Sequence, residues 1–479
     1  MHDRRLATVF TQKLLAPSTV FAVPDNIATL TFRTIKDYCF YNHMPFIPSF
    51  RKSHYRKIFF PVPSRIGSEL VNEQRNILNI WLRFNSNIGA LYSFSEKVTE
   101  LADESDREKI KAISAKLAGL FRDNPGEVEK EIASLFPSID DLDIYPDIRN
   151  NESVKELLEE LKDTSFIEQV KGWEKKHPFK SQKFAEILFS AFIDPPMNGV
   201  ILRKSILISL VTFLEILIQD VFVSHFLAQG EIKKKALELA DGMSNSWGKR
   251  LSNLEIIGIG TLAQSKYREE IIEITKRRNL LVHNDGVVDD DYLGKAPQKF
   301  KSIKPGSVFI VSTQYLQRAL DITYAFGLYL CIKQWKLNHI PEIEQSKEID
   351  KLLIPALNKR RYKLVLEITN HLSDECLPIQ MPQRFLADRA IAYRELGQAK
   401  EVKKIITKLE KLNDHWSNSV AIAMLTNNLA DLQKVLKDNR IPANISSWPL
   451  FDPVKDEIWF KNIFMQKNKH AVRIQKNRR

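Results

Sequence analysis

Glycine and cysteine are both scarce in this chain. There are 16 glycines in 479 residues, which argues against a turn-rich β protein and favours long helices with short connections. The three cysteines, Cys39, Cys331 and Cys376, form no CxxC pair. The sequence therefore predicts neither a disulfide framework nor a zinc knuckle, as is typical of a reducing cytoplasm. We expect a cytoplasmic, all-α protein.

The motifs of the common nucleotide-binding and hydrolase folds are also missing. The sequence has no GxxxxGK(S/T), no GxGxxG and no GxSxG, and the isolated Gly258-Ile259-Gly260 is typical of a turn between helices. No cluster of His, Cys, Asp and Glu has the spacing of a metal site. We therefore expect no cofactor and no metal ion.

One hydrophobic run raises the question of a membrane. Residues 206–218 are predominantly apolar and contain one charged residue, Glu215, and charged residues flank them on both sides. A membrane span needs about 20 predominantly apolar residues, so the run predicts a buried helix. The N-terminus shows no signal-peptide pattern, and we expect no membrane association.

The net charge of +12 is concentrated at the two ends of the sequence. Residues 1–65 contribute +7 and residues 466–479 contribute +6, which leaves about −1 for the remainder. Basic ends attract phosphates regardless of base sequence. A nucleic-acid-binding regulator that works through these ends is one hypothesis, and a solubilising or disordered C-terminal tail is the alternative for residues 466–479.

Composition and periodicity divide the sequence into five segments. Pro195-Pro196 marks the sharpest boundary, because neither proline fits inside a helix. The segments are a basic, aromatic stretch at 1–65, a region of helical hairpins with unknown role at 66–195, a four-helix bundle at 196–340, helical repeats at 345–445, and a basic tail at 446–479.

The bundle prediction comes from four helical patterns around one hydrophobic member. They cover residues 201–228, 231–242, 265–282 and 313–337, with a flexible loop rich in Asp, Gly and Pro at 283–307. The repeat prediction comes from three similar stretches, at 353–368, 390–406 and 421–436. Their spacing is typical of helix-pair solenoids, and the middle stretch resembles the first helix of a tetratricopeptide repeat (TPR). An α-helical cap on the bundle is the alternative.

The third helical pattern contains an arginine on its apolar face. Apolar side chains recur there at steps of four and three, at Tyr267, Ile271, Ile274 and Leu281. Position 278 belongs to the same stripe and is Arg278, which must find a partner for its charge. Glu215 is the candidate structural partner. A phosphate at a subunit interface is the functional alternative. The adjacent Arg277 is expected to face solvent.

His283 lies at the end of this helix, five residues after Arg278. The two side chains are about 140° apart on an ideal helix, so they converge only if the helix frays at Val282 or if two subunits meet. Asn279 shares a face with His283. Asn284 begins a helix-stop turn and is an expected orienting residue.

Arg278-Asn279-x-x-x-His283 resembles the Arg-x4–6-His signature of HEPN ribonucleases, and the flanking helices resemble that family over about residues 198–340. The resemblance implies a HEPN-like bundle, a homodimer with a composite site, and metal-independent RNA cleavage by attack of the 2′-OH on the adjacent phosphate. It assigns catalytic roles to Arg278, His283 and Asn279, and it suggests a toxin or phage-defence abortive-infection effector whose repeats bind a protein partner or trigger. The alternative is a non-catalytic HEPN/TPR scaffold for dimerisation and protein binding.

Overall fold

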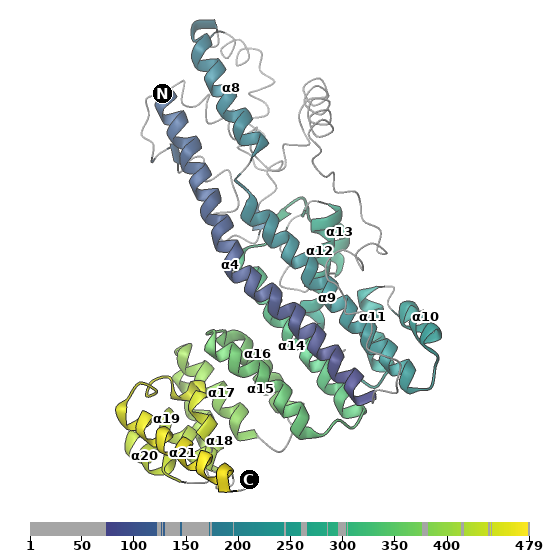
Figure 1. The fold of residues 1–479 in the computed structure, drawn as a ribbon. Helices are drawn as coiled ribbons and strands as arrows, with labels where there is room; N and C mark the ends of the chain where they lie inside the picture. Colours follow the sequence, from purple (N-terminus) through teal and green to yellow (C-terminus); the bar gives the residue numbers. More distant parts are fainter. Residues whose placement is uncertain are drawn as a thin grey trace. The chain divides into compact units, whose positions relative to one another are not determined.

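The computed structural model describes 73–121, 175–194, 196–243, 246–259, 266–284, 286–295, 305–375, 382–412, 416–438 and 443–477, with a few isolated positions that include 144–145. This part is mostly helical, which confirms the all-α prediction (Figure 1). Its strands are two residues long: β1 (Ile144–Tyr145) pairs antiparallel with β2 (Val308–Phe309). The predicted segment 1–65 lies outside the described residues.

The described chain forms two compact units. Unit 1 contains Gly89–Thr212 and Ile272–Gln317, and unit 2 contains Glu73–Ile88, Phe213–Ile271 and Arg318–Arg479. The predicted bundle segment, 196–340, contributes to both units.

The helices that build these units are α4 (Glu73–Phe121), α8 (Pro178–Ile193), α9 (Asn198–Ala228), α10 (Lys233–Met243), α11 (Trp247–Ile256), α12 (Lys266–His283), α13 (Asp290–Lys295) and α14 (Thr313–Leu337). The four predicted helices of 196–340 correspond to α9, α10, α12 and α14, with ends that differ by three residues or fewer. The helices α11 and α13, which are short, were not among the predicted ones.

The prediction of helical hairpins in 66–195 is wrong for residues 73–121. They form one helix of 49 residues, α4, which Figure 1 shows as a single long rod. The charged stretch 102–116 continues this helix because it contains no proline and keeps an apolar face, where Ile110 and Ile113 are buried. With Leu117, they join the core that α4 forms with α8 in unit 1.

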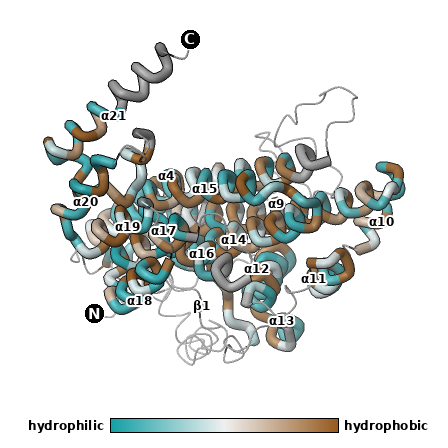
Figure 2. Tube along the Cα trace, turned by 90° about the horizontal axis from the view of Figure 1, so that it is seen from below, coloured by the Kyte–Doolittle hydropathy of each residue, from teal (hydrophilic) through white to brown (hydrophobic). Residues whose placement is uncertain are grey.

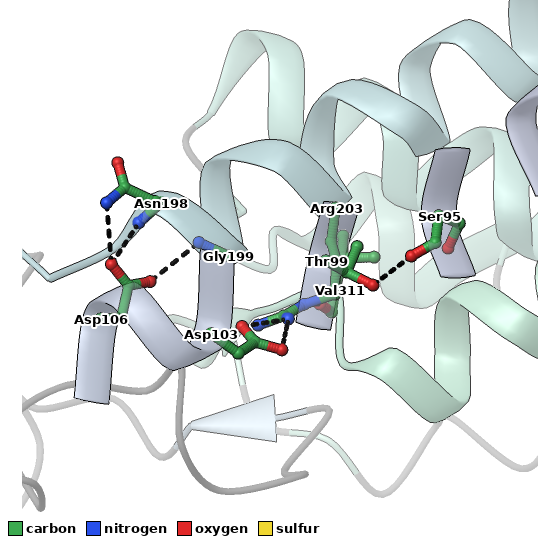
Figure 3. A network of polar contacts seen from close by, with 8 residues as sticks. All are labelled: Ser95, Thr99, Asp103, Asp106, Asn198, Gly199, Arg203 and Val311. Carbon is green, nitrogen blue, oxygen red and sulfur yellow. Dashed lines mark hydrogen bonds and ion pairs between the residues drawn. The ribbon is translucent and has the colours of Figure 1, made fainter. Parts of the chain in front are cut away.

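A carboxylate from α4 caps the first turn of α9 within unit 1 (Figure 3). Asp106 is fully buried and accepts hydrogen bonds from the Asn198 backbone N–H at 3.1 Å, the Asn198 Nδ2 at 3.0 Å and the Gly199 backbone N–H at 2.8 Å. The first backbone N–H groups of a helix have no partner inside the helix. Asp106 therefore satisfies donors that α9 cannot satisfy itself.

A second contact of α4 with α9 lies one turn away, and Figure 3 shows it beside the cap. The Arg203 Nη1 contacts both oxygens of Asp103, at 2.6 and 2.7 Å, and its Nε donates to the Val311 carbonyl at 2.8 Å. The Arg203 side chain is buried. A Cβ on Gly199 would overlap the Asp103 carboxylate, so this close approach requires glycine.

One described helix, α9, meets the length and hydropathy criteria of a membrane span. Half of its most apolar stretch is buried, and core helices of soluble proteins pass the same test. The hydrophobic side chains of α9 that lie buried are Ile206, Leu207, Leu210, Val211, Leu214, Leu217, Ile218, Val221 and Phe222.

Unit 2 contains a cluster of large aromatic side chains. Trp81 is fully buried, and its ring centroid lies 6.2 Å from those of Phe84 and Trp335 and 6.1 Å from that of Tyr324. Gly327 allows this packing, because a Cβ there would overlap the Phe84 ring. The start of α4 is therefore held against α14 by aromatic packing.

After α14, unit 2 continues with three successive helix pairs. They are α15 (Glu342–Asn358) with α16 (Tyr362–Glu375), α17 (Pro382–Glu395) with α18 (Ala399–Glu410), and α19 (Trp416–Leu425) with α20 (Leu429–Leu436). Two short 3₁₀ helices follow, η4 (Ala443–Ser447) and η5 (Pro449–Phe451), and then α21 (Ile458–Asn477). Along α18 and α20, hydrophobic and hydrophilic residues alternate, as Figure 2 shows.

The same turn joins the two helices of each pair. Arg360, Gly397 and Asn427 adopt positive φ, of 57°, 73° and 56°. In each case the next residue donates its N–H to a carbonyl five residues back, which is a common way to end a helix. Each turn falls inside one of the three predicted similar stretches. The structure thus gives each stretch the form of two helices joined by a tight turn.

Candidate functional site

The C-terminal end of α12 is fixed by hydrogen bonds that return to the helix. The N–H groups of Asn284 and Gly286 both donate to the Leu280 carbonyl, at 2.8 and 3.0 Å. Gly286 adopts φ +85°, a conformation in which glycine is favoured. The helix stays regular through its last residue, His283.

The chain after this turn is anchored to the strand β2. Phe309 donates its N–H to the Gly286 carbonyl at 2.8 Å, and Val288 exchanges backbone hydrogen bonds with Ser307 and Gly306, each at 2.8 Å. Residues 290–295 form α13. The prediction of a flexible loop is therefore wrong for residues 286–295, because it missed these backbone partners.

Arg277 is the buried arginine of α12. Its side chain is fully buried, and its Nε donates to Glu273 Oε1 at 2.8 Å, one helical turn away. The guanidinium carbon lies 3.7 Å from the ring centroid of Tyr315 and 4.1 Å from that of Phe309. The prediction that Arg277 faces solvent is wrong, since two rings from later in the chain enclose it.

Glu273 completes this buried cluster. It accepts hydrogen bonds from the Tyr315 hydroxyl at 2.8 Å and from the Tyr292 hydroxyl at 3.2 Å. Burial, and then the Glu273 carboxylate, raise the pKa of both phenols well above the ordinary value of 10.0. Both tyrosines therefore remain protonated and act as donors. We refer to Glu273, Arg277, Tyr292, Phe309 and Tyr315 as the Arg277 cluster.

The residues predicted as catalytic lie on the more accessible side of the same helix end. Arg278 is half-buried, and its Nη1 donates to the Asn279 Oδ1 at 2.9 Å. His283 is exposed. Asn284 is also exposed, and its Nδ2 donates to the Val287 carbonyl at 2.7 Å, so it stabilises the turn. The structure brings Arg278 and Asn279 into contact.

The regular end of α12 bears on how Arg278 and His283 could act together. Because the helix includes His283, these side chains point about 140° apart around one helix axis. Fraying at Val282, one of the two routes to convergence considered above, does not occur in this structure. Pairing of two subunits is the remaining route.

Glu215, the proposed structural partner of Arg278, forms an ion pair with Arg250. The Arg250 Nη1 lies 2.7 Å from Glu215 Oε1, and the Arg250 guanidinium stacks 4.9 Å from the Trp247 ring centroid. Arg250 and Trp247 both belong to α11, a helix that was not among the predicted ones. Glu215 therefore joins α9 to α11 within unit 2.

The sequence held a partial signal for the Arg277 cluster. Glu273 and Arg277 are four residues apart, with the acidic residue first, the favourable order for a helical ion pair. Nothing in the sequence indicated that Tyr292 and Tyr315 lie against this pair. Among the described residues, no group of three or more His, Cys, Asp or Glu side chains could hold a metal ion.

Comparison of this chain with protein-family models, with curated proteins and with solved structures gives no match.

Proposed function

We propose that this protein is a metal-independent endoribonuclease that acts as a homodimer, with Arg278, Asn279 and His283 at its active site. The observation that carries the proposal is the division of roles between two adjacent arginines. Arg277 is enclosed in a buried cluster, whereas Arg278 and His283 are at least partly accessible at the same helix end.

The residue types suit cleavage by attack of the RNA 2′-OH on the adjacent phosphate. An imidazole can accept or donate a proton near neutral pH, which fits His283 as the acid or base. A guanidinium keeps its charge and binds phosphate oxygens through two parallel N–H groups, which fits Arg278 as the stabiliser of developing charge. The contact with Asn279 orients that guanidinium.

A dimer is part of the proposal because of the helix geometry. Arg278 and His283 point in different directions from one regular helix. A composite site, with the arginine of one subunit beside the histidine of its partner, removes that difficulty. In this arrangement neither subunit alone has a complete site.

The central experiment is RNA cleavage by the purified protein in excess EDTA. We expect cleavage by the wild type and loss of at least about 100-fold in rate for His283→Ala and Arg278→Ala. Arg268→Ala, a change on the same helix, is the control and should cleave normally. Equal cleavage by the His283 and Arg278 variants would remove the assigned site. An inactive wild type would favour the non-catalytic scaffold.

Mixing the two inactive variants tests the composite site. Co-expressed Arg278→Ala and His283→Ala subunits should form mixed dimers with one intact arginine–histidine pair. We expect these dimers to recover RNA cleavage that neither variant shows alone. Absence of recovery in isolated mixed dimers would mean that one subunit supplies both groups.

The helix pairs α15–α20 are the proposed binding surface for a protein partner or trigger, and we propose that they are TPR-like. Three similar pairs in succession form an extended surface of the kind that repeat proteins use for binding. In this proposal the protein is a cytoplasmic toxin or phage-defence effector. Overexpression should arrest growth, and His283→Ala should abolish the arrest.

A further inference from the structure

We propose that Arg277 and Glu273 are positioning residues that hold the end of α12, and the turn after it, in the geometry that presents Arg278 and His283. The catalytic consequence of this inference rests on the proposed function. Its structural consequence rests on packing alone and can be tested separately.

Arg277 contacts the strand β2 through Phe309. The Arg277 guanidinium lies 4.1 Å from the ring centroid of Phe309. The Phe309 backbone N–H donates to the Gly286 carbonyl at 2.8 Å, and the Gly286 N–H donates to the Leu280 carbonyl at 3.0 Å. A continuous chain of contacts therefore runs from Arg277, through Phe309, to the turn directly after His283.

The turn after His283 packs tightly against β2. A Cβ on Gly286 would lie 2.6 Å from the Phe309 carbonyl oxygen and 3.3 Å from the Leu281 Cδ2. The turn thus presses against the backbone of the residue that stacks on Arg277. Leu280, Val288 and Phe309 also belong to one small hydrophobic core. A displacement of the Phe309 backbone would therefore move Gly286, and with it the turn that ends α12.

Arg277 is itself held in place by its contacts with three helices. Glu273 binds Arg277 at 2.8 Å and accepts hydrogen bonds from Tyr292 of α13 and Tyr315 of α14. The Tyr315 ring also stacks on the guanidinium, 3.7 Å away. The ion pair therefore joins three helices at one point and sets their directions relative to the helix end.

A buried ion pair adds little net stability over a well-packed apolar pair, because removing both charges from water is costly. Its hydrogen bonds nevertheless have directions that apolar contacts lack. We therefore assign the pair to positioning, and the assignment predicts a variant that keeps the fold and loses the geometry.

The experiment uses the double variant Glu273→Leu/Arg277→Met, which replaces both charges by apolar side chains of similar size. Hydrogen exchange of the Gly286 and Phe309 amides should become at least about tenfold faster than in the wild type. The kcat for RNA cleavage should fall by about 100-fold, while KM stays within about threefold. The matched control is Glu215→Leu/Arg250→Met, a mostly buried ion pair of unit 2, which should leave both amides as protected as in the wild type.

Unchanged protection of the Gly286 and Phe309 amides in the folded double variant overturns the proposal, whatever happens to cleavage. An inactive wild type removes the proposed function, and the exchange measurement still decides on positioning. If the double variant fails to fold, Tyr315→Phe replaces it, because this change keeps the ring on Arg277 and removes only the hydrogen bond to Glu273. A smaller increase in exchange at the same two amides is then expected, and no increase refutes the inference.

Discussion

A buried carboxyl in the helix pairs makes the stability of unit 2 depend on pH. Asp388 of α17 is fully buried, and its Oδ1 accepts a hydrogen bond from the Trp448 indole at 2.8 Å. Its Oδ2 has no hydrogen-bond partner among the described residues. Burial raises the pKa of Asp388 from the ordinary 3.8 to about 7, although the Trp448 hydrogen bond and Arg384 lower it.

The direction of the pH dependence follows from the number of protons bound by the folded and the unfolded chain. Between pH 4 and pH 7 the folded protein keeps a proton on Asp388 that the unfolded chain has released, so stability falls as the pH rises. Each pH unit costs about 1.4 kcal/mol in this range. With a folded pKa of about 7, the loss is on the order of 4 kcal/mol and is complete above about pH 8.

The variant Asp388→Asn removes this titration. An asparagine keeps the oxygen that accepts from Trp448 and cannot ionise, but it buries an amide N–H₂ in place of Oδ2 and costs about 1–3 kcal/mol at every pH. The variant should therefore gain stability relative to the wild type as the pH rises, and it should be more stable than the wild type at pH 8.

Urea unfolding followed by tryptophan fluorescence, at intervals from pH 4.5 to pH 8.5, measures this effect. The quantity of interest is the unfolding free energy of the variant minus that of the wild type, which should rise by about 3–4 kcal/mol across the range. The matched control is Asp456→Asn, at an 86% exposed side chain, for which the same difference should stay nearly constant. A flat difference for Asp388→Asn would refute the assigned burial of a protonated acid.

Three further predictions concern stability, and urea unfolding at pH 7 checks each one. Asp106→Ala should lower the unfolding free energy by about 1–2 kcal/mol, because α9 loses its cap, whereas an equal stability would show that water replaces the carboxylate. Gly327→Ala should cost about 1–3 kcal/mol by overlap with Phe84, and Phe84→Leu in the same chain should recover part of that loss. Gly397→Ala should cost about 1 kcal/mol through its positive φ alone, since no atom lies within 4 Å of the added Cβ. A larger loss for Gly397→Ala would indicate a packing role that the structure does not show.

Periodicity predicted the long helices well because their apolar residues recur over many turns. The patterns at 201–228 and 313–337 correspond closely to α9 and α14. The shorter α11 and α13, of ten and six residues, contain too few turns to give a clear period. Residues 73–121 form the single helix α4 and not the expected helical hairpins. The charged run 102–116 does not end this helix, because apolar residues still recur there at helical spacing.

The candidate site was predicted only in part, for a related reason. The apolar stripe of α12 correctly identified Tyr267 and Ile271 as buried. The assignment of solvent exposure to Arg277 failed, because its neighbours come from positions up to 38 residues away in the sequence. The apolar positions of one helix do not show how much of that helix is covered by later segments of the chain. Tyr292 and Tyr315 pack against Glu273, which lies outside the apolar positions of α12, and so bury a wider part of the helix.

The burial of Arg277 helps to decide which of the two arginines belongs to the proposed active site. Both Arg277 and Arg278 precede His283 at a spacing that fits Arg-x4–6-His, so the motif cannot choose between them. An arginine stacked between two rings and bound to Glu273 cannot reach a phosphate without breaking a buried ion pair. Arg278 is half-buried, and its Nη1 donates to the Asn279 Oδ1 at 2.9 Å. Arg277→Met and Arg278→Met should both abolish cleavage. Only the Arg277 variant should also speed up hydrogen exchange of the Gly286 amide. That difference separates an arginine that holds the site from one that binds the scissile phosphate.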